Sequence, residues 1–129
     1  MSVGVLLVTH AGVGNALLET ARGVVNLMPL KIAVLEVPWK VDVAAMAYQA
    51  NHLLRELDDG HGVLILTDLY GASPANVTEH LEPCRKLRRV SGLNLSMLLR
   101  VLTYSDYKLD ALAELAFEGG RAGIISDHA

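Results

Sequence analysis

The sequence predicts an α/β fold, in which an open, doubly wound parallel sheet carries helices on both faces. Three short runs are apolar at nearly every position, as in strands buried on both faces of a parallel sheet: residues 3–9, 32–37 and 63–67. Segments of helical periodicity separate the runs, which begin about one βα unit apart. We therefore expect four parallel strands in the order 2-1-3-4.

The size and composition predict one domain over residues 1–129. With 52% hydrophobic and 19% charged residues, the chain is typical of a compact globular protein. Its longest apolar run, residues 43–48, is far below the ~20 residues of a membrane helix, and the N-terminus lacks the features of a secretory signal. A single cysteine, Cys84, fits a reducing compartment. We therefore expect a cytoplasmic protein.

The composition also argues against several kinds of ligand. The net charge of −3 gives no general attraction to nucleic acid. Gly12-Val13-Gly14 lacks the third glycine of a dinucleotide fingerprint, because Leu17 stands in its place. Four histidines have no companions at the spacing of metal ligands: His52, His61, His80 and His128. The sequence therefore predicts no cofactor and no metal.

Two amphipathic helices separate the first three strands. Apolar residues recur at intervals of three and four in both segments. In the first they are Leu17, Ala21, Val24, Val25 and Met28, and in the second Val43, Met46, Ala47, Ala50, Leu53, Leu54 and Leu57.

A third helix is expected after the strand at residues 63–67. Ser73 is suited to cap its free amides, Pro74 to occupy its first position, and Pro83 to end it. A weaker fourth strand lies within residues 88–92.

The C-terminal part is predicted to be mostly helical. Residues 95–102 and 109–117 have helical character, and the pair Gly119-Gly120 is expected to stop the second of these helices. Residues 122–126 then favour a short final strand.

Polar residues follow the first and third strands, where ligands collect in an open parallel sheet. The first strand leads into Thr9-His10 and the third into Thr67-Asp68. In the strand order 2-1-3-4 these ends are neighbours, which brings His10 and Asp68 within reach of each other. An aspartate that accepts a hydrogen bond from one imidazole nitrogen leaves the other nitrogen unprotonated and able to attack phosphorus.

Both loops lead into helix N-termini, which favour an anion. The sequence therefore predicts five phosphate-proximal residues: Gly12, Gly14, Asn15, Gly71 and Ser73. Gly12 and Gly14 are equally consistent with a tight turn alone. Trp39, after the second strand, is either a packing residue or part of the rim of a partner site.

Three segments of the chain form a distinctive set: Thr9-His10-Ala11-Gly12, Thr67-Asp68-Leu69-Tyr70-Gly71-Ala72-Ser73-Pro74-Ala75-Asn76 and Ser91-Gly92-Leu93-Asn94-Leu95-Ser96-Met97-Leu98. Together they resemble the IIA component of the mannose family of the phosphoenolpyruvate-dependent sugar phosphotransferase system. Their order and spacing match, and the resemblance covers essentially the whole chain.

The resemblance implies a phosphocarrier for sugar uptake. His10 would accept a phosphoryl group from the phosphocarrier protein HPr and pass it to a IIB component, Asp68 would orient His10, and Ser73 would lie near the phosphate. The protein would meet the membrane only indirectly, through a IIC/IID complex. The family fold adds an antiparallel strand exchanged within a homodimer, which residues 122–126 match. Since the chain stops at Ala129, no fused IIB domain is expected.

Two departures from the family pattern bear on the downstream partner. Tyr70 stands where sugar-transporting members often have tryptophan, and Ser96 replaces a common proline. A regulatory phosphoprotein with no sugar channel is therefore an alternative that shares every site residue. A hydrolase with Ser73 as nucleophile is a weaker one, because Pro74 has no amide to offer an oxyanion.

Overall fold

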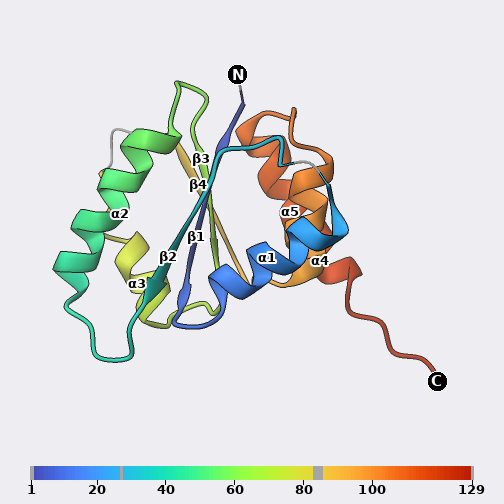
Figure 1. Ribbon diagram of the computed structural model, residues 1–129, viewed down its shortest axis with the longest axis horizontal. Coiled ribbons are helices and arrows are strands. Elements are labelled where there is room, and N and C mark those ends of the chain that lie inside the picture. The colour runs from blue at the N-terminus through green and yellow to red at the C-terminus, as the bar shows by residue number, and fades with distance from the viewer. Residues whose placement is uncertain (1, 27, 83–85, 129) are drawn as a thin grey trace.

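The computed structural model describes residues 2–26, 28–82 and 86–128. Four parallel strands form a sheet in the order β2-β1-β3-β4, as predicted (Figure 1). The strands are β1 (Gly4–His10), β2 (Ile32–Val37), β3 (Val63–Thr67) and β4 (Leu87–Ser91). The helices are α1 (Gly14–Val24), α2 (Val43–Leu57), α3 (Ser73–Thr78), α4 (Leu95–Thr103) and α5 (Leu109–Ala122).

Helices cover both faces of the sheet, which makes the fold doubly wound. Apolar residues of α1, α4 and α5 pack on one face, and those of α2 and α3 pack on the other (Figure 1). Every residue of β3 is buried, as is every residue of β1 except His10, so the apolar runs mark the two central strands. Within the described residues, no helix has the length and apolar character of a membrane span.

The strand order brings the carboxyl ends of β1 and β3 together. The two strands pair in parallel, with Val8 opposite Thr67. His10 is the last residue of β1, and Asp68 comes directly after β3. Both residues therefore lie at one edge of the sheet.

Two helices differ in extent from the sequence prediction. The first ends at Val24, so the apolar residues Val25 and Met28 lie beyond it. The third ends at Thr78, and Pro83, expected to end it, lies outside the described residues, as does Cys84.

The predicted cap of the third helix is wrong by one residue. Ala72 is the N-cap of α3 and makes no side-chain capping bond, while Ser73 is already helical and Pro74 follows in the first turn. A residue inside the helix cannot act as its N-cap, so the Ser73 hydroxyl is not used in that way.

The glycine pair Gly119-Gly120 does not stop α5, contrary to the sequence prediction. A Cβ at position 119 would lie 2.5 Å from the Cβ of Arg100, and one at position 120 would lie 2.8 Å from the Cε of Met97. Both glycines thus let α5 approach α4 closely, and the contact is tied by the Asn94 side-chain amide, which donates to the carbonyl of Gly120 at 3.0 Å. Packing between helices therefore outweighs the low helix propensity of glycine.

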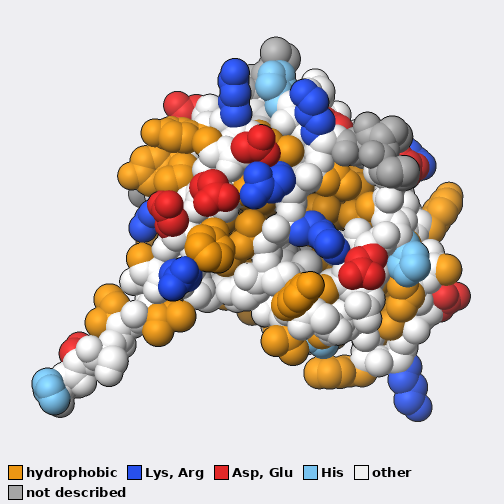
Figure 2. Space-filling model, turned by 180° about the vertical axis from the view of Figure 1, so that it is seen from behind, with side chains coloured by type: hydrophobic (Ala, Val, Ile, Leu, Met, Phe, Trp, Pro, Cys, Tyr) orange, Lys and Arg blue, Asp and Glu red, His pale blue; other side chains and the backbone are white. Residues whose placement is uncertain are grey.

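The predicted final strand at residues 122–126 is absent from the single chain. Ala122 belongs to α5, and residues 124–128 have no regular secondary structure. This tail projects from the body of the protein, and the space-filling view shows hydrophobic side chains on it (Figures 1 and 2). Its exchange within a dimer stays a prediction.

Candidate functional site

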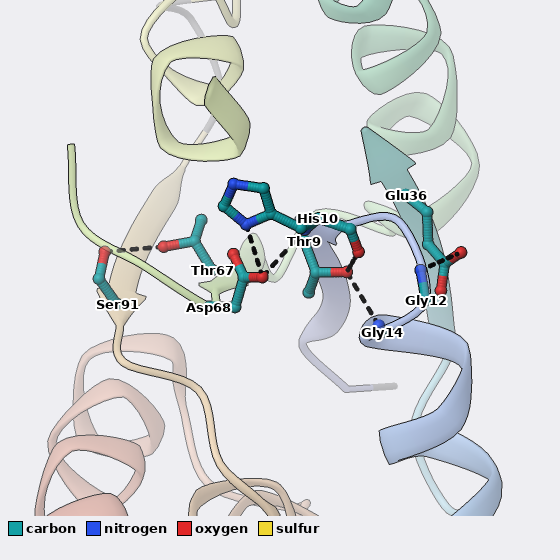
Figure 3. Close-up of polar contacts among 8 residues, drawn as sticks. All are labelled: Thr9, His10, Gly12, Gly14, Glu36, Thr67, Asp68 and Ser91. Atoms are coloured by element: carbon teal, nitrogen blue, oxygen red, sulfur yellow. Dashed lines mark hydrogen bonds and ion pairs between the residues drawn. The ribbon is translucent and has the colours of Figure 1, made fainter. Parts of the chain in front are cut away.

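His10 and Asp68 form a close pair at the edge of the sheet. The Nδ1 atom of His10 lies 2.9 Å from Oδ2 of Asp68, and the same oxygen accepts the backbone N–H of His10 at 2.9 Å (Figure 3). The side chains are 18% and 13% exposed, respectively. The second oxygen, Oδ1, is buried without a hydrogen-bond partner among the described residues. One carboxylate oxygen therefore fixes both the backbone and the ring of His10.

This contact decides which ring nitrogen is available. A carboxylate oxygen can only accept, so Nδ1 carries the proton in the neutral ring. The other nitrogen, Nε2, points away from Asp68 and keeps its lone pair (Figure 3). The pair therefore presents a nucleophilic nitrogen at the edge of the sheet.

The loop after β1 is held by a residue that the sequence analysis did not single out. The Glu36 carboxylate, near the end of β2, accepts the backbone N–H of Gly12 at 3.1 Å (Figure 3). It also accepts the backbone N–H of Asn15 at 3.0 Å. The Gly14 N–H donates to the Thr9 hydroxyl at 2.9 Å. These three amides, expected to face a phosphate, already have protein acceptors, and their proximity to a phosphoryl group stays a prediction.

The charge of Glu36 is favoured by this arrangement. The backbone N–H groups of Asn15 and then Gly12 lower the pKa of its carboxyl from the ordinary value of 4.5, while desolvation acts in the opposite direction. At neutral pH a carboxylate thus lies at the positive end of the α1 dipole. A charged residue near the end of an otherwise apolar strand is the signal that could have revealed it.

Gly12 and Gly14 each have a structural reason to be glycine. Gly12 has a φ of +90°, a conformation that L side chains rarely adopt. At Gly14, a Cβ would lie 2.7 Å from Val34 Cγ1 and 2.8 Å from the Thr9 hydroxyl. Gly12 therefore allows the turn, and Gly14 allows α1 to begin close to the sheet.

On the other side of the pair, the loop after β3 leads into α3. Its base is fixed by the buried Thr67 hydroxyl, which donates to the Ser91 hydroxyl at 2.7 Å (Figure 3). Gly71 has a φ of +80° and allows the turn into the helix. No hydrogen bond joins Ser73 to His10 among the described residues, so the contact that a Ser73 hydrolase requires is not observed.

Trp39 is largely exposed rather than packed in the core and lies beside the ring of His10; its place on the rim of a partner site stays a prediction. Its ring centroid is 5.0 Å from that of His10, with an angle of 34° between the ring planes. The other histidines are all exposed: His52, His61, His80 and His128.

Comparison with known proteins now decides the family. The family model EIIA-man, described as "PTS system fructose IIA component", matches residues 4–117. The chain belongs to this family. This match confirms that the chain is a IIA component of the phosphotransferase system, as its sequence motifs indicated. IIA components of this system are phosphotransferases.

A curated relative is similar to the chain in sequence, and solved structures share its fold. The chain is 29% identical over 127 residues to the mannose-specific EIIAB component of Escherichia coli K12, covering 96% of this chain and 39% of that protein. It therefore spans well under half of the curated relatives that it matches. The mannose/sorbose-specific IIA subunit of Enterococcus faecalis has the same fold, with a TM-score of 0.85, 22% identity and coverage of 100% of this chain and 97% of that one. The phosphotransferase system component EIIA of Streptococcus agalactiae also has this fold, with a TM-score of 0.81, 23% identity and coverage of 96% of each chain.

Proposed function

We propose that this protein is a cytoplasmic phosphocarrier that acts through a phosphohistidine at His10. It accepts the phosphoryl group from phosphorylated HPr and passes it to a IIB component, for the uptake and phosphorylation of a sugar. The observation that carries the proposal is the 2.9 Å contact between His10 Nδ1 and Asp68 Oδ2 in a member of the IIA family.

The transfer follows from the state of the ring. The lone pair of Nε2 attacks phosphorus, the bond between phosphorus and the donor's histidine nitrogen breaks, and the donor nitrogen keeps the bonding electrons. His10 retains its proton on Nδ1, so the phosphorylated ring carries a positive charge. The Asp68 carboxylate, 2.9 Å from Nδ1, stabilises that charge and holds the ring in place. Transfer to IIB reverses these steps.

The backbone at the start of α3 would receive the phosphoryl oxygens. Gly71 lies in the loop after Asp68 and Ser73 is the first residue of α3, and within the described residues no hydrogen bond occupies the backbone N–H of either. Gly12, Gly14 and Asn15, whose amides have protein acceptors, would border the phosphate on the opposite side, after β1.

The same geometry would also suit a regulatory phosphoprotein that passes no phosphoryl group to a sugar channel. Transfer to a IIB component distinguishes the carrier from the regulator, because only the carrier loses its phosphoryl group to IIB.

The oligomer we propose is a homodimer in which the C-terminal segment pairs with a second copy. Contact with the membrane would occur through a IIC/IID complex.

Phosphorylation by the purified donor system tests the proposal. The protein is incubated with phosphoenolpyruvate, enzyme I and HPr, and its intact mass is measured. We expect a gain of one acid-labile phosphoryl group, its loss in His10→Ala, and its retention in His61→Ala, whose ring also contacts a carboxylate, Asp59, at 2.8 Å. Uptake by a folded His10→Ala variant would overturn the assignment.

A further inference from the structure

Trp39 is an exposed indole that packing within the chain does not explain. It lies in the loop between β2 and α2, and 79% of it is exposed. Burial of an aromatic ring stabilises a protein through the area removed from water, and little of this ring is removed. Among the described residues, the aromatic ring that Trp39 contacts is that of His10, at 5.0 Å between centroids.

The ring that Trp39 contacts is the one that becomes charged. With Nδ1 protonated toward Asp68, bond formation at Nε2 converts a neutral imidazole into a cation. The face of an aromatic ring carries negative electrostatic potential, and among side chains indole attracts cations most strongly, at centroid distances up to about 6 Å. The tilted contact at 5.0 Å falls within that range.

We propose that Trp39 is a positioning residue for phosphoryl transfer, which stabilises the cationic ring of phosphorylated His10 and holds it against Asp68. The phosphorus–nitrogen bond of the donor breaks as the bond to Nε2 forms, and the proton on Nδ1 stays in place. The carboxylate acts on the edge of the ring and the indole acts on its face. This inference rests on the proposed function, because it requires a phosphoryl group on His10.

An exposed aromatic beside a transfer site could instead serve only to dock the donor protein. The two roles differ in what they change. A docking contact alters the rates of forward and reverse transfer equally, so it leaves the equilibrium between free proteins unchanged. A contact that favours the phosphorylated ring over the free ring shifts that equilibrium.

The test is the equilibrium constant for phosphoryl exchange between HPr and this protein, measured by intact mass at dilutions where complexes are negligible. Trp39→Leu removes the aromatic face, and Trp39→Phe keeps a weaker one. We expect Trp39→Leu to lower the constant about two- to fivefold, with Trp39→Phe in between. Circular dichroism checks that each variant is folded.

Tyr70→Leu is the matched control. Tyr70 is 81% exposed, follows Asp68 in the neighbouring loop, and has no ring contact with His10 among the described residues. We expect its equilibrium constant to equal that of the parent even if its rate falls. A parent-like constant in Trp39→Leu, or an equal shift in Tyr70→Leu, overturns the role of Trp39.

The unaltered protein offers a second measurement, since Trp39 is the only tryptophan in the sequence. Its emission should change when His10 is phosphorylated, because the adjacent ring becomes cationic. If the mass shows full phosphorylation but the emission is unchanged, the role of Trp39 is contradicted while the proposed function stands. Absence of phosphorylation in the parent contradicts the proposed function as well.

Discussion

Within the described residues, the Asp68 carboxylate accepts two hydrogen bonds through one oxygen, from the backbone and from the ring of His10. An asparagine at this position retains an acceptor for these N–H groups but supplies no negative charge. We therefore expect Asp68→Asn to remain folded and to accept phosphoryl groups from HPr roughly 100- to 1,000-fold more slowly, the range seen when one charge-stabilising group is removed.

Rapid-quench measurement of phosphoryl uptake checks this expectation. The matched control is Asp59→Asn, because the Asp59 carboxylate also contacts a histidine Nδ1, that of His61, at 2.8 Å. That pair precedes β3 and lies at the opposite edge of the sheet. A parent-like rate in Asp68→Asn, or an equal loss in Asp59→Asn, would contradict the role of Asp68.

Glu36 should make stability depend on pH. Its carboxyl pKa is lowered in the folded protein by the amides of Asn15 and Gly12, so its stabilising effect is full above the ordinary pKa of 4.5 and is lost as the pH falls through the lowered value. We expect Glu36→Gln to lower the free energy of unfolding by about 0.5–1 kcal/mol at pH 7, as for the loss of a helix cap.

Urea unfolding of the parent and Glu36→Gln between pH 7 and pH 3 measures this difference. The gap between the two proteins should narrow at the acidic end, where Glu36 is protonated. A gap that stays constant over the whole range would mean that the charge of Glu36 is not what stabilises the loop.

At the level of elements, the packing of α4 against α5 depends on Gly119 in α5. Alanine has the higher helix propensity, but here it would disturb this packing. A Cβ at position 119 would lie 2.5 Å from Arg100 Cβ, so Gly119→Ala forces the helices apart. We expect this variant to be destabilised by about 1–3 kcal/mol. Gly23→Ala in α1, where a Cβ meets nothing within 4 Å, should instead be stabilised by up to about 1 kcal/mol. Thermal unfolding of both variants tests the contrast, and equal effects would contradict it.

Most of the fold could be predicted because local pattern and tertiary structure agree in the central strands. The segments at β1 and β3 are apolar on both faces, which fixes their place in the middle of the sheet. The end of α5 could not be predicted from the sequence, because a glycine pair usually indicates the end of a helix. Gly119 and Gly120 are tolerated within α5 because they allow it to pack closely against α4. The final strand is not formed in the single chain, and its pairing with a second copy stays a prediction, because a local pattern does not specify a pairing partner.

The site was predictable only in part, for a similar reason. Strand order alone implied that His10 and Asp68 meet, and the structure gives the contact. Glu36 accepts a hydrogen bond from the loop after β1, although it belongs to a segment whose apolar pattern predicted a buried strand. Trp39 reaches His10 through the path of the loop after β2, which no local pattern specifies.

For the whole molecule, the tail after α5 is the part that a second copy would cover. Ile124 and Ile125 are 79% and 78% exposed in the single chain, and β2 and β4 end the sheet with one side of each unpaired among the described strands. We expect truncation after Gly123 to convert a dimer into a monomer that still accepts a phosphoryl group. Sedimentation of both proteins is the measurement. A monomeric parent, or a truncated protein that dimerises equally well, would contradict strand exchange.

The central claim is that His10 Nε2 carries the phosphoryl group while Asp68 holds Nδ1. The most direct measurement is nuclear magnetic resonance of the phosphorylated protein with ¹⁵N-labelled histidine, which identifies the nitrogen coupled to phosphorus. We expect a single phosphorylated histidine, assigned as His10 by its loss in His10→Ala, with phosphorus on Nε2 and a proton on Nδ1. Phosphorus on Nδ1, or on any other residue, would contradict the account.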